Sequence, residues 1–153
     1  MAIVLIAPSV MAAEFYYDLN DKKLTYDQLV SQPKTVLFIW ATWCPTCREK
    51  VSELAKENNI RKDVNVIFIN VGEKRNEVVR TLDALHVPQE MRAHVYLDPF
   101  QEIINRFYFN AVPTVLFFQD GALIKTAHTL TSGLIDDVYP ADKNSPETKK
   151  PNA

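Results

Sequence analysis

Three shortages in the sequence each exclude a class of site. The 153 residues include only three glycines, Gly72, Gly121 and Gly133, too few and too scattered for a Gly-rich phosphate-binding loop. Two cysteines and three dispersed histidines do not supply the four spaced ligands of a structural zinc site, so we expect no metal site. Positive charge is not in excess either: the formal net charge is −2, and we therefore expect no binding to nucleic acid.

The remaining composition is that of an ordinary globular protein. Hydrophobic residues make up 47% of the chain and charged residues 24%, and no internal repeat is present. A chain of this length is expected to form one domain with a real hydrophobic core. We place that domain at residues 14–138. Residues 139–153 are rich in Pro, Lys, Asp, Asn and Ser without periodicity, and are predicted to form a disordered tail.

Residues 1–13 are similar to the end of a secretory signal peptide, with a short apolar core and small residues suited to cleavage after Ala12. The basic start of such a signal is missing, because no Lys or Arg precedes Lys22; a truncated or misassigned start would explain this. An irregular apolar N-terminus and a buried first strand are the alternatives, and the run is too short to span a bilayer. A chain without further cysteines suits an oxidising compartment. We therefore expect a periplasmic or otherwise extracytoplasmic protein, with membrane association through the N-terminus left open.

The two cysteines form a C-x-x-C pair between an apolar strand, residues 35–40, and an amphipathic helix, residues 48–59. The first turn of a helix has unpaired N–H groups and partial positive charge. Cys44 falls at about the N-cap and Pro45 at the first helical position, so a Cys44 thiolate would be stabilised and its pKa lowered. Cys47, one turn further in, shares the apolar face and should be the more buried sulfur. The pattern predicts thiol–disulfide exchange, with Cys44 as the exposed nucleophile and Cys47 as the resolving thiol.

Other uses of the same two sulfurs remain open. A purely structural disulfide is one, although closing so short a loop constrains the unfolded chain little. Peroxidases carry a Thr three residues before the attacking Cys, and here Ala41 precedes Cys44 by three while Cys44 itself precedes Cys47 by three. A copper-handling protein would bind soft Cu(I) through the thiolates, with a His or Met nearby that is not adjacent in sequence. A redox-inactive interaction domain is disfavoured because both cysteines are intact.

Hydrophobic periodicity indicates alternating strands and helices around this pair. Apolar runs predict parallel strands covered by helices, and the turn at residues 119–121 predicts an antiparallel hairpin. Strands are expected at residues 14–19, 36–40, 64–71, 93–97, 114–118 and 122–127, and helices at 25–29, 48–59, 74–85, 99–107 and 132–138. An aromatic group is expected to pack in the core: Phe100, Phe107, Tyr108 and Phe109. The order predicts an α/β fold whose central mixed sheet has helices on both faces and the dithiol at the end of a central strand.

This order, together with two motifs, resembles the thioredoxin fold. The motifs are Trp-Ala-Thr-Trp-Cys-Pro-Thr-Cys at residues 40–47 and Val-Pro-Thr at residues 112–114. More specifically, the chain is similar to the TlpA/ResA-like extracytoplasmic thiol–disulfide oxidoreductases from about Phe15 to Val138. The similarity includes an inserted helix-strand unit between Lys74 and Leu97 that plain thioredoxins lack.

The resemblance implies an enzyme, a protein thiol–disulfide oxidoreductase whose only redox group is the Cys44–Cys47 disulfide, without a further cofactor. It favours the reducing direction, with protein disulfides as substrates and cytochrome c maturation or redox homeostasis as the expected role. A membrane-bound electron donor would then re-reduce the dithiol, and a monomer is expected.

The resemblance also implies a substrate-binding surface around the dithiol. In this fold the proline before the hairpin follows a cis peptide bond and faces the cysteines, which here is the Val112–Pro113 bond. Such a turn leaves the backbone of Val112 free to pair with an extended substrate segment. An ordinary trans proline at the sheet edge is the alternative. Trp43, Pro45 and Thr46 complete the surface, with Trp43 shielding the nucleophile and offering an apolar contact to partners.

Two departures from the family pattern concern the proton of Cys47. The buried carboxylate that thioredoxins carry six residues before the first cysteine is Phe38 here. The Glu that the TlpA/ResA-like group often carries three residues after the second cysteine is Lys50. Water, Glu49 or Glu73 are the candidate proton handlers. We hypothesise instead that Lys50 stabilises a thiolate as a cation, the alternative being a solvated surface lysine.

Overall fold

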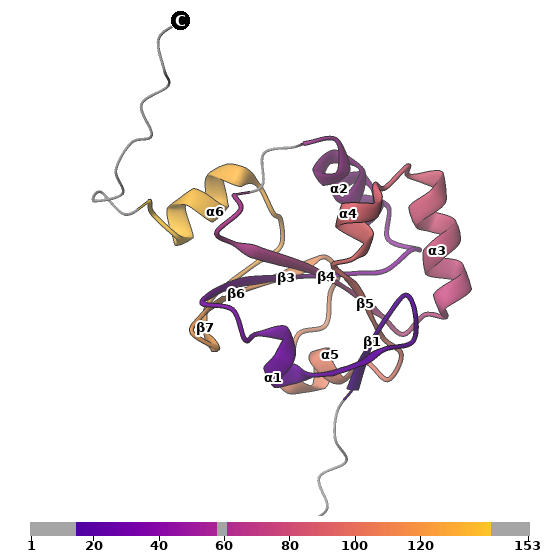
Figure 1. Ribbon diagram of the computed structural model, residues 1–153, viewed down its shortest axis with the longest axis horizontal. Coiled ribbons are helices and arrows are strands. Elements are labelled where there is room, and N and C mark those ends of the chain that lie inside the picture. Colours follow the sequence, from indigo (N-terminus) through magenta and orange to yellow (C-terminus); the bar gives the residue numbers. More distant parts are fainter. Residues whose placement is uncertain (1–14, 58–60, 142–153) are drawn as a thin grey trace, which may run out of the picture.

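The protein is built on a seven-stranded sheet with the strand order β2-β1-β5-β4-β3-β6-β7 (Figure 1). The computed structural model describes residues 15–57 and 61–141, so the predicted signal segment lies outside the described residues. The strands are β1 (Phe15–Asp18), β2 (Lys23–Thr25), β3 (Lys34–Trp40), β4 (Asn65–Val71), β5 (Val95–Asp98), β6 (Thr114–Gln119) and β7 (Ala122–Ala127). The helices are α1 (Tyr26–Leu29), α2 (Pro45–Lys56), α3 (Arg75–Ala84), α4 (Gln89–Arg92), α5 (Glu102–Phe107) and α6 (Ser132–Val138).

Helices cover both faces of the sheet, which confirms the predicted architecture. α2, α3, α4 and α6 lie on one face and α1 and α5 on the other (Figure 1). β3 is buried on both faces, because Val36, Phe38 and Trp40 belong to one core cluster and Leu37 and Ile39 to the other. This is the burial expected of a parallel strand between two helical layers. The inserted unit contains α3 and β5 as predicted, and also the short helix α4, which the periodicity did not reveal.

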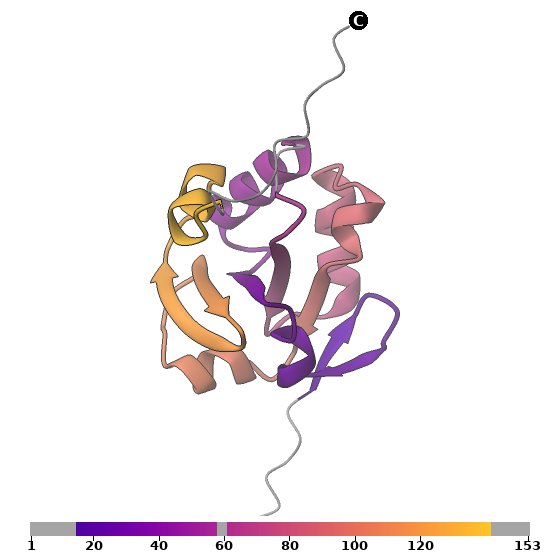
Figure 2. The ribbon, with the colours of Figure 1, turned by 60° about the vertical axis from the view of Figure 1, so that its left-hand side comes forward.

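Strand direction brings distant segments together at one edge of the sheet. β3, β4 and β5 run parallel, so their carboxyl ends meet at the same edge. β6 runs antiparallel to β3 with Thr114 opposite Ile39, so the segment before β6 returns to the point where β3 ends and α2 follows. The β1–β2 and β6–β7 hairpins lie at opposite sides of the sheet (Figure 2). The edge formed by these carboxyl ends is therefore the place where the cysteines, Pro113 and the loop after β4 converge.

The buried carboxylate of Asp98 lies at this edge of the sheet, at the end of β5. Asp98 is fully buried, and its carboxylate accepts hydrogen bonds from the backbone N–H groups of Glu102 and Ile103, each at 2.9 Å. Burial raises the pKa of Asp98. These bonds cap the first turn of α5, which has unpaired N–H groups of its own. The aspartate thus fixes the approach of α5 to the sheet.

Part of the predicted aromatic packing is wrong. Phe107 does contact the core, where its ring lies 5.7 Å from that of Phe118. Phe100 and Tyr108, however, are 71% and 92% exposed. The reason is backbone conformation, since Gln101 and Tyr108 have positive φ angles of 58° and 53° at the two ends of α5. These turns direct the flanking residues off the apolar face of the helix.

The boundary predicted for the C-terminal tail is also wrong by at least one residue. Tyr139 was assigned to the tail, but it is only 2% exposed and its ring packs against that of Phe117. Its hydroxyl lies 2.7 Å from the carbonyl oxygen of Phe118 and 3.0 Å from that of Thr35. Burial raises the pKa of Tyr139 to about 12. The ordered domain therefore includes the residue after α6.

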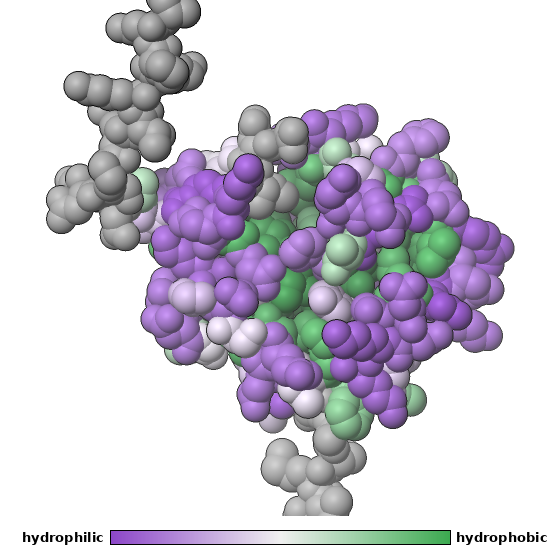
Figure 3. Space-filling model, viewed as in Figure 1, coloured by the Kyte–Doolittle hydropathy of each residue, from purple (hydrophilic) through white to green (hydrophobic). Residues whose placement is uncertain are grey.

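The outer surface is mainly hydrophilic, with apolar side chains visible in the middle of the face seen in Figure 3. A pocket on the molecule has Leu54, Val66 and Met91 in its lining. It lies toward the amino ends of β3 and β4, away from the cysteines. Among the described residues, no helix combines the length and the apolar character needed to cross a bilayer.

Candidate active site

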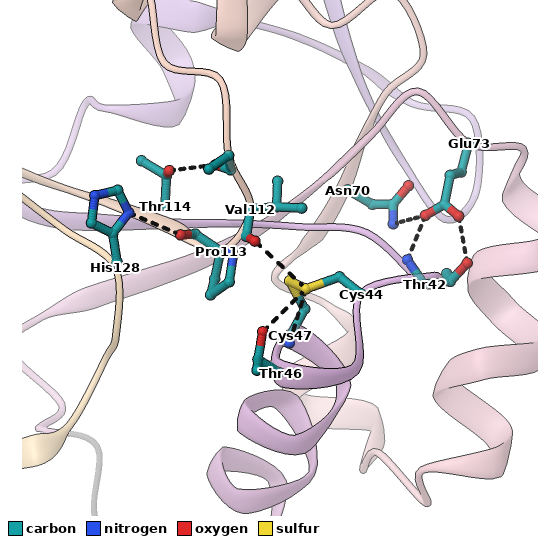
Figure 4. Close-up of a disulfide and its surroundings, with 11 residues drawn as sticks. Thr42, Cys44, Thr46, Cys47, Asn70, Glu73, Val112, Pro113, Thr114 and His128 are labelled. Carbon is teal, nitrogen blue, oxygen red and sulfur yellow. Dashed lines mark hydrogen bonds between the residues drawn. A yellow bond between two sulfur atoms is a disulfide. The ribbon is translucent and has the colours of Figure 1, made fainter.

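The two cysteines form a disulfide at the start of α2 (Figure 4). Cys44 is the N-cap residue, Pro45 occupies the first turn, and the Cα atoms of the cysteines are 5.2 Å apart. Cys47 is fully buried and Cys44 is 4% exposed. The expected order of burial holds, but Cys44 is less exposed than predicted. Its sulfur is turned toward Cys47 in the disulfide and is covered from the other side by the loop at Val112.

Hydrogen-bond donors converge on the sulfur of Cys44. The backbone N–H of Cys47 donates to Cys44 Sγ at 3.2 Å, which is the N-cap bond of the helix. The Thr46 hydroxyl lies 3.4 Å from the same sulfur and is the donor, because a disulfide sulfur has no proton. In the reduced protein both donors would face a Cys44 thiolate. Hydrogen bonds to the charged form and the positive end of a helix both favour ionisation of a thiol.

The segment before β6 lies against the disulfide. The Val112–Pro113 peptide bond is cis, as the resemblance implied. The carbonyl oxygen of Val112 is 3.7 Å from Cys44 Sγ, and the Thr114 hydroxyl donates to the Ala111 carbonyl at 2.6 Å. His128, at the end of β7, places Nδ1 3.3 Å from the carbonyl oxygen of Pro113, so this nitrogen carries the proton (Figure 4).

The surface beside the dithiol is open. Trp43 is 70% exposed, and Pro45 and Thr46 are exposed as well. Trp40, by contrast, is fully buried in the core. The exposed indole next to a nearly buried disulfide gives an apolar contact that a second protein can reach. Of the predicted substrate-contacting residues, Thr46 and Val112 both contact the sulfur of Cys44.

Among the described residues, none of the three candidate charge or proton modulators forms a hydrogen bond or an ion pair with a cysteine. Lys50 forms an ion pair with Glu53 one turn along α2, and Glu49 is exposed. The carboxylate of Glu73 is bound by Thr42 and Asn70 (Figure 4). The position of the thioredoxin carboxylate is apolar here.

That position belongs to Phe38, whose ring packs edge-on against that of Phe68 at 5.8 Å. Lys50 pairs with Glu53 as an ordinary lysine on a helix surface does. The group that handles the proton of Cys47 therefore stays a matter of prediction.

Three residues at this site were not predicted: Thr42, Asn70 and His128. Asn70 had a signal, since it is a polar residue near the end of a mainly apolar strand. Thr42 had none beyond its place in the motif, because its partner Glu73 is 31 residues away. His128 contacts Pro113 only through the pairing of β6 with β7, and neither residue alone indicates it.

The described residues contain no group of three or more His, Cys, Asp or Glu side chains arranged to hold a metal ion. A buried, helix-capping dithiol facing a cis-proline loop on a mixed sheet is a dithiol site of the thioredoxin-fold class. A family model described as thioredoxin-like matches residues 33–122, more than half of the chain. The chain belongs to the thioredoxin-like family.

Individual relatives agree with this assignment. The chain is 33% identical over 75 residues to a thiol:disulfide interchange protein DsbE of Vibrio cholerae, a match covering 46% of this chain and 38% of the relative. The match thus spans about two fifths of that relative's length. The expected similarity to TlpA/ResA-like thiol–disulfide oxidoreductases is confirmed at the level of family and fold.

Solved structures show the same fold. A secreted Mycobacterium tuberculosis disulfide oxidoreductase homologous to E. coli DsbE superposes with a TM-score of 0.65 at 16% identity, covering 80% of this chain and 94% of that chain. StoA from Bacillus subtilis gives a TM-score of 0.63 at 20% identity, covering 85% and 98%. At these identities the likeness establishes the fold.

Proposed function

We propose that the protein is a thiol–disulfide oxidoreductase that acts on protein disulfides through Cys44 and Cys47. The observation that carries the proposal is the sulfur of Cys44 at the N-cap of α2, accepting the backbone N–H of Cys47 at 3.2 Å. A thiolate in this place faces the positive end of the helix and two hydrogen-bond donors. That environment lowers the pKa of a thiol and raises the thiolate fraction near neutral pH.

The reaction takes two displacements at sulfur. The Cys44 thiolate attacks one sulfur of a substrate disulfide, so a new S–S bond forms, the old one breaks, and the other substrate sulfur leaves as a thiolate. Cys47 then loses its proton and attacks Cys44 Sγ. This breaks the mixed disulfide, releases the second substrate thiolate and closes the Cys44–Cys47 disulfide. The substrate gains two electrons and the enzyme loses two.

The substrate segment is proposed to bind along Val112, in the manner of an added strand. The Val112 carbonyl oxygen, 3.7 Å from Cys44 Sγ, lies next to the reacting sulfur. A substrate cysteine paired with this backbone would therefore present its disulfide to Cys44. Trp43, 70% exposed beside the nucleophile, supplies the apolar contact. Backbone pairing with one apolar contact suits many sequences, which fits a reductant of protein disulfides in general.

We propose further that the protein works outside the cytoplasm, as a monomer, in the reducing direction. The DsbE relative and the secreted mycobacterial structure support an extracytoplasmic place. A reductant in an oxidising compartment needs re-reduction, and a membrane-bound dithiol donor would supply the two electrons. Cytochrome c maturation is the role that the family resemblance favours.

The test is the reduction potential of the dithiol, measured against glutathione, combined with reduction of insulin by the reduced protein. For a reductant we expect a potential of about −270 mV together with insulin reduction. A potential of about −120 mV would indicate an oxidant. Cu(I) is added in a parallel series, because soft thiolates also bind this ion. Tight copper binding with negligible disulfide exchange would contradict the proposal and favour copper handling instead.

A further inference from the structure

We propose that Glu73 is a positioning residue for the dithiol: its carboxylate clamps the turn that sets Cys44 at the N-cap of α2. This inference rests on the proposed function and adds a role that differs from proton transfer. The turn contains residues 41–44 and is closed by the N–H of Cys44, which donates to the Ala41 carbonyl at 3.2 Å. It connects the end of β3 to the start of α2.

Both donors of Thr42, the second residue of the turn, are bound by Glu73. The backbone N–H of Thr42 donates to Glu73 Oε2 at 2.7 Å, and the Thr42 hydroxyl donates to Oε1. The side-chain amide of Asn70 donates to Oε2 at 2.7 Å. One carboxylate thus accepts three hydrogen bonds, two of them from a single residue of the dithiol turn (Figure 4). Charge-assisted bonds of this kind are about twice as strong as neutral ones.

Glu73 is itself held in place from β4 and β5. Asn70 is fully buried in β4, two residues before Gly72. Gly72 has a φ of 73°, and its N–H donates to the Asp98 carbonyl at 2.9 Å. A side chain at this glycine would meet Gln101 Nε2 at 2.8 Å, so the backbone passes close under that residue. The clamp is therefore fixed to the rigid edge of the sheet.

The three hydrogen bonds that Glu73 accepts favour a positioning role over proton transfer. An ionised carboxylate is an acceptor only, whereas a protonated one carries an O–H in place of one acceptor. Three N–H and O–H donors converge on Glu73, and a carboxyl proton would compete with them for the same oxygens. In Figure 4 the bonds drawn from the carboxylate run to Thr42, in the turn, and to Asn70. This arrangement suits a fixed acceptor that holds a turn.

Positioning and simple charge effects have opposite signs at Cys44. Removal of a nearby negative charge alone would favour the thiolate and lower the pKa of Cys44. Loss of the clamp would instead let the turn loosen, move Cys44 from the N-cap and weaken the bond from the N–H of Cys47. The thiolate would then lose stabilisation. A misplacement of about 1 Å can cost a reaction on the order of a hundredfold in rate.

The test compares Glu73→Ala, Glu73→Gln and Thr42→Val with Glu77→Ala in the full chain. Glu77, in the first turn of α3, accepts the N–H of Lys74 and is a charge-matched control. Glutamine can keep the clamp without the charge: its oxygen can accept the Thr42 N–H. Its amide nitrogen would then take the place of Oε1, next to the Thr42 hydroxyl, which can accept a hydrogen bond as well as donate one. Thr42→Val removes one clamp bond without changing charge, and serves if Glu73→Ala does not fold.

The readouts are the pH profile of iodoacetamide alkylation of the reduced protein and the rate of insulin reduction. Glu73→Ala is expected to lower the rate of alkylation at neutral pH and the rate of insulin reduction, each about tenfold or more. It is also expected to raise the apparent pKa of Cys44. Thr42→Val should show a smaller loss of the same kind, and Glu73→Gln and Glu77→Ala should stay within about threefold of wild type.

Equal loss in Glu73→Ala and Glu73→Gln, with a limb of the pH profile removed, would overturn positioning in favour of proton transfer. Wild-type behaviour of Glu73→Ala, or of Thr42→Val if only that variant folds, would also overturn it. If the wild-type protein itself alkylates slowly and leaves insulin intact, the proposed function fails and the role of Glu73 fails with it.

Discussion

Cys44→Ser is expected to abolish reduction of protein disulfides, whereas Cys47→Ser is expected to stop the reaction one step later, as a mixed disulfide. Loss of the attacking sulfur should lower the rate by at least about 10³-fold, the scale on which removal of a nucleophile acts. In Cys47→Ser the first displacement can still occur, but no second sulfur can release the substrate. The adduct should accumulate and be visible as a mass increase that a reductant reverses.

The chain is well suited to this measurement because it contains only two cysteines. Any adduct on Cys47→Ser must be at Cys44, and the double serine variant is a blank that lacks both sulfurs. The burial of the two sulfurs supports the order of attack, since Cys47 is fully buried and Cys44 is 4% exposed. Trapping on Cys44→Ser instead, through Cys47, would reverse the assigned roles.

Removal of residues 139–153 is expected to destabilise the protein by about 3–5 kcal/mol, the usual cost of deleting a large buried aromatic side chain. Tyr139 packs on Phe117 and hydrogen-bonds two strand carbonyls, and its own carbonyl oxygen accepts a bond from Arg61. The free energy of unfolding is measured by urea denaturation followed by far-UV circular dichroism. Tyr139→Phe, which loses only the hydroxyl, should cost about 1–2 kcal/mol.

The matched control is removal of residues 142–153, which leaves Tyr139 in place. These residues lie outside the described part of the chain, and the prediction that they form a disordered tail implies a change within about 0.5 kcal/mol. Equal stability of the two truncated proteins would show that the contacts of Tyr139 contribute nothing measurable. The domain would then end at Val138, as the composition suggested.

Local patterns predicted the parts of the fold that depend on neighbouring residues. The double-sided apolar runs revealed β3 and β4, and the position of Pro45 after Cys44 revealed the start of α2. The family resemblance supplied the cis bond before Pro113. Each of these features follows from residues that are close in sequence or from a motif that names them.

The parts that were missed depend on contacts across the sheet. Glu73 meets Thr42 only because β3 and β4 are parallel neighbours, and Tyr139 is buried only because α6 returns its end to β3 and β6. Phe100 and Tyr108 escape the core through left-handed residues at the ends of α5, which no periodicity reveals. Long-range hydrogen bonds and positive φ angles leave little trace in composition or spacing.

The most direct test of the central claim is the rate at which reduced Cys44 reacts with iodoacetamide as a function of pH, measured in the Cys47→Ser variant. A thiolate held by the N-terminus of α2 and the Thr46 hydroxyl should react with an apparent pKa clearly below about 8.5, the value of a free cysteine. With an apparent pKa of about 7 or lower, as for thiols at helix N-termini, the rate should therefore rise no more than about twofold between pH 7 and pH 9. A rate that rises about twentyfold over that range, as for a free cysteine with a pKa of about 8.5, would contradict the account.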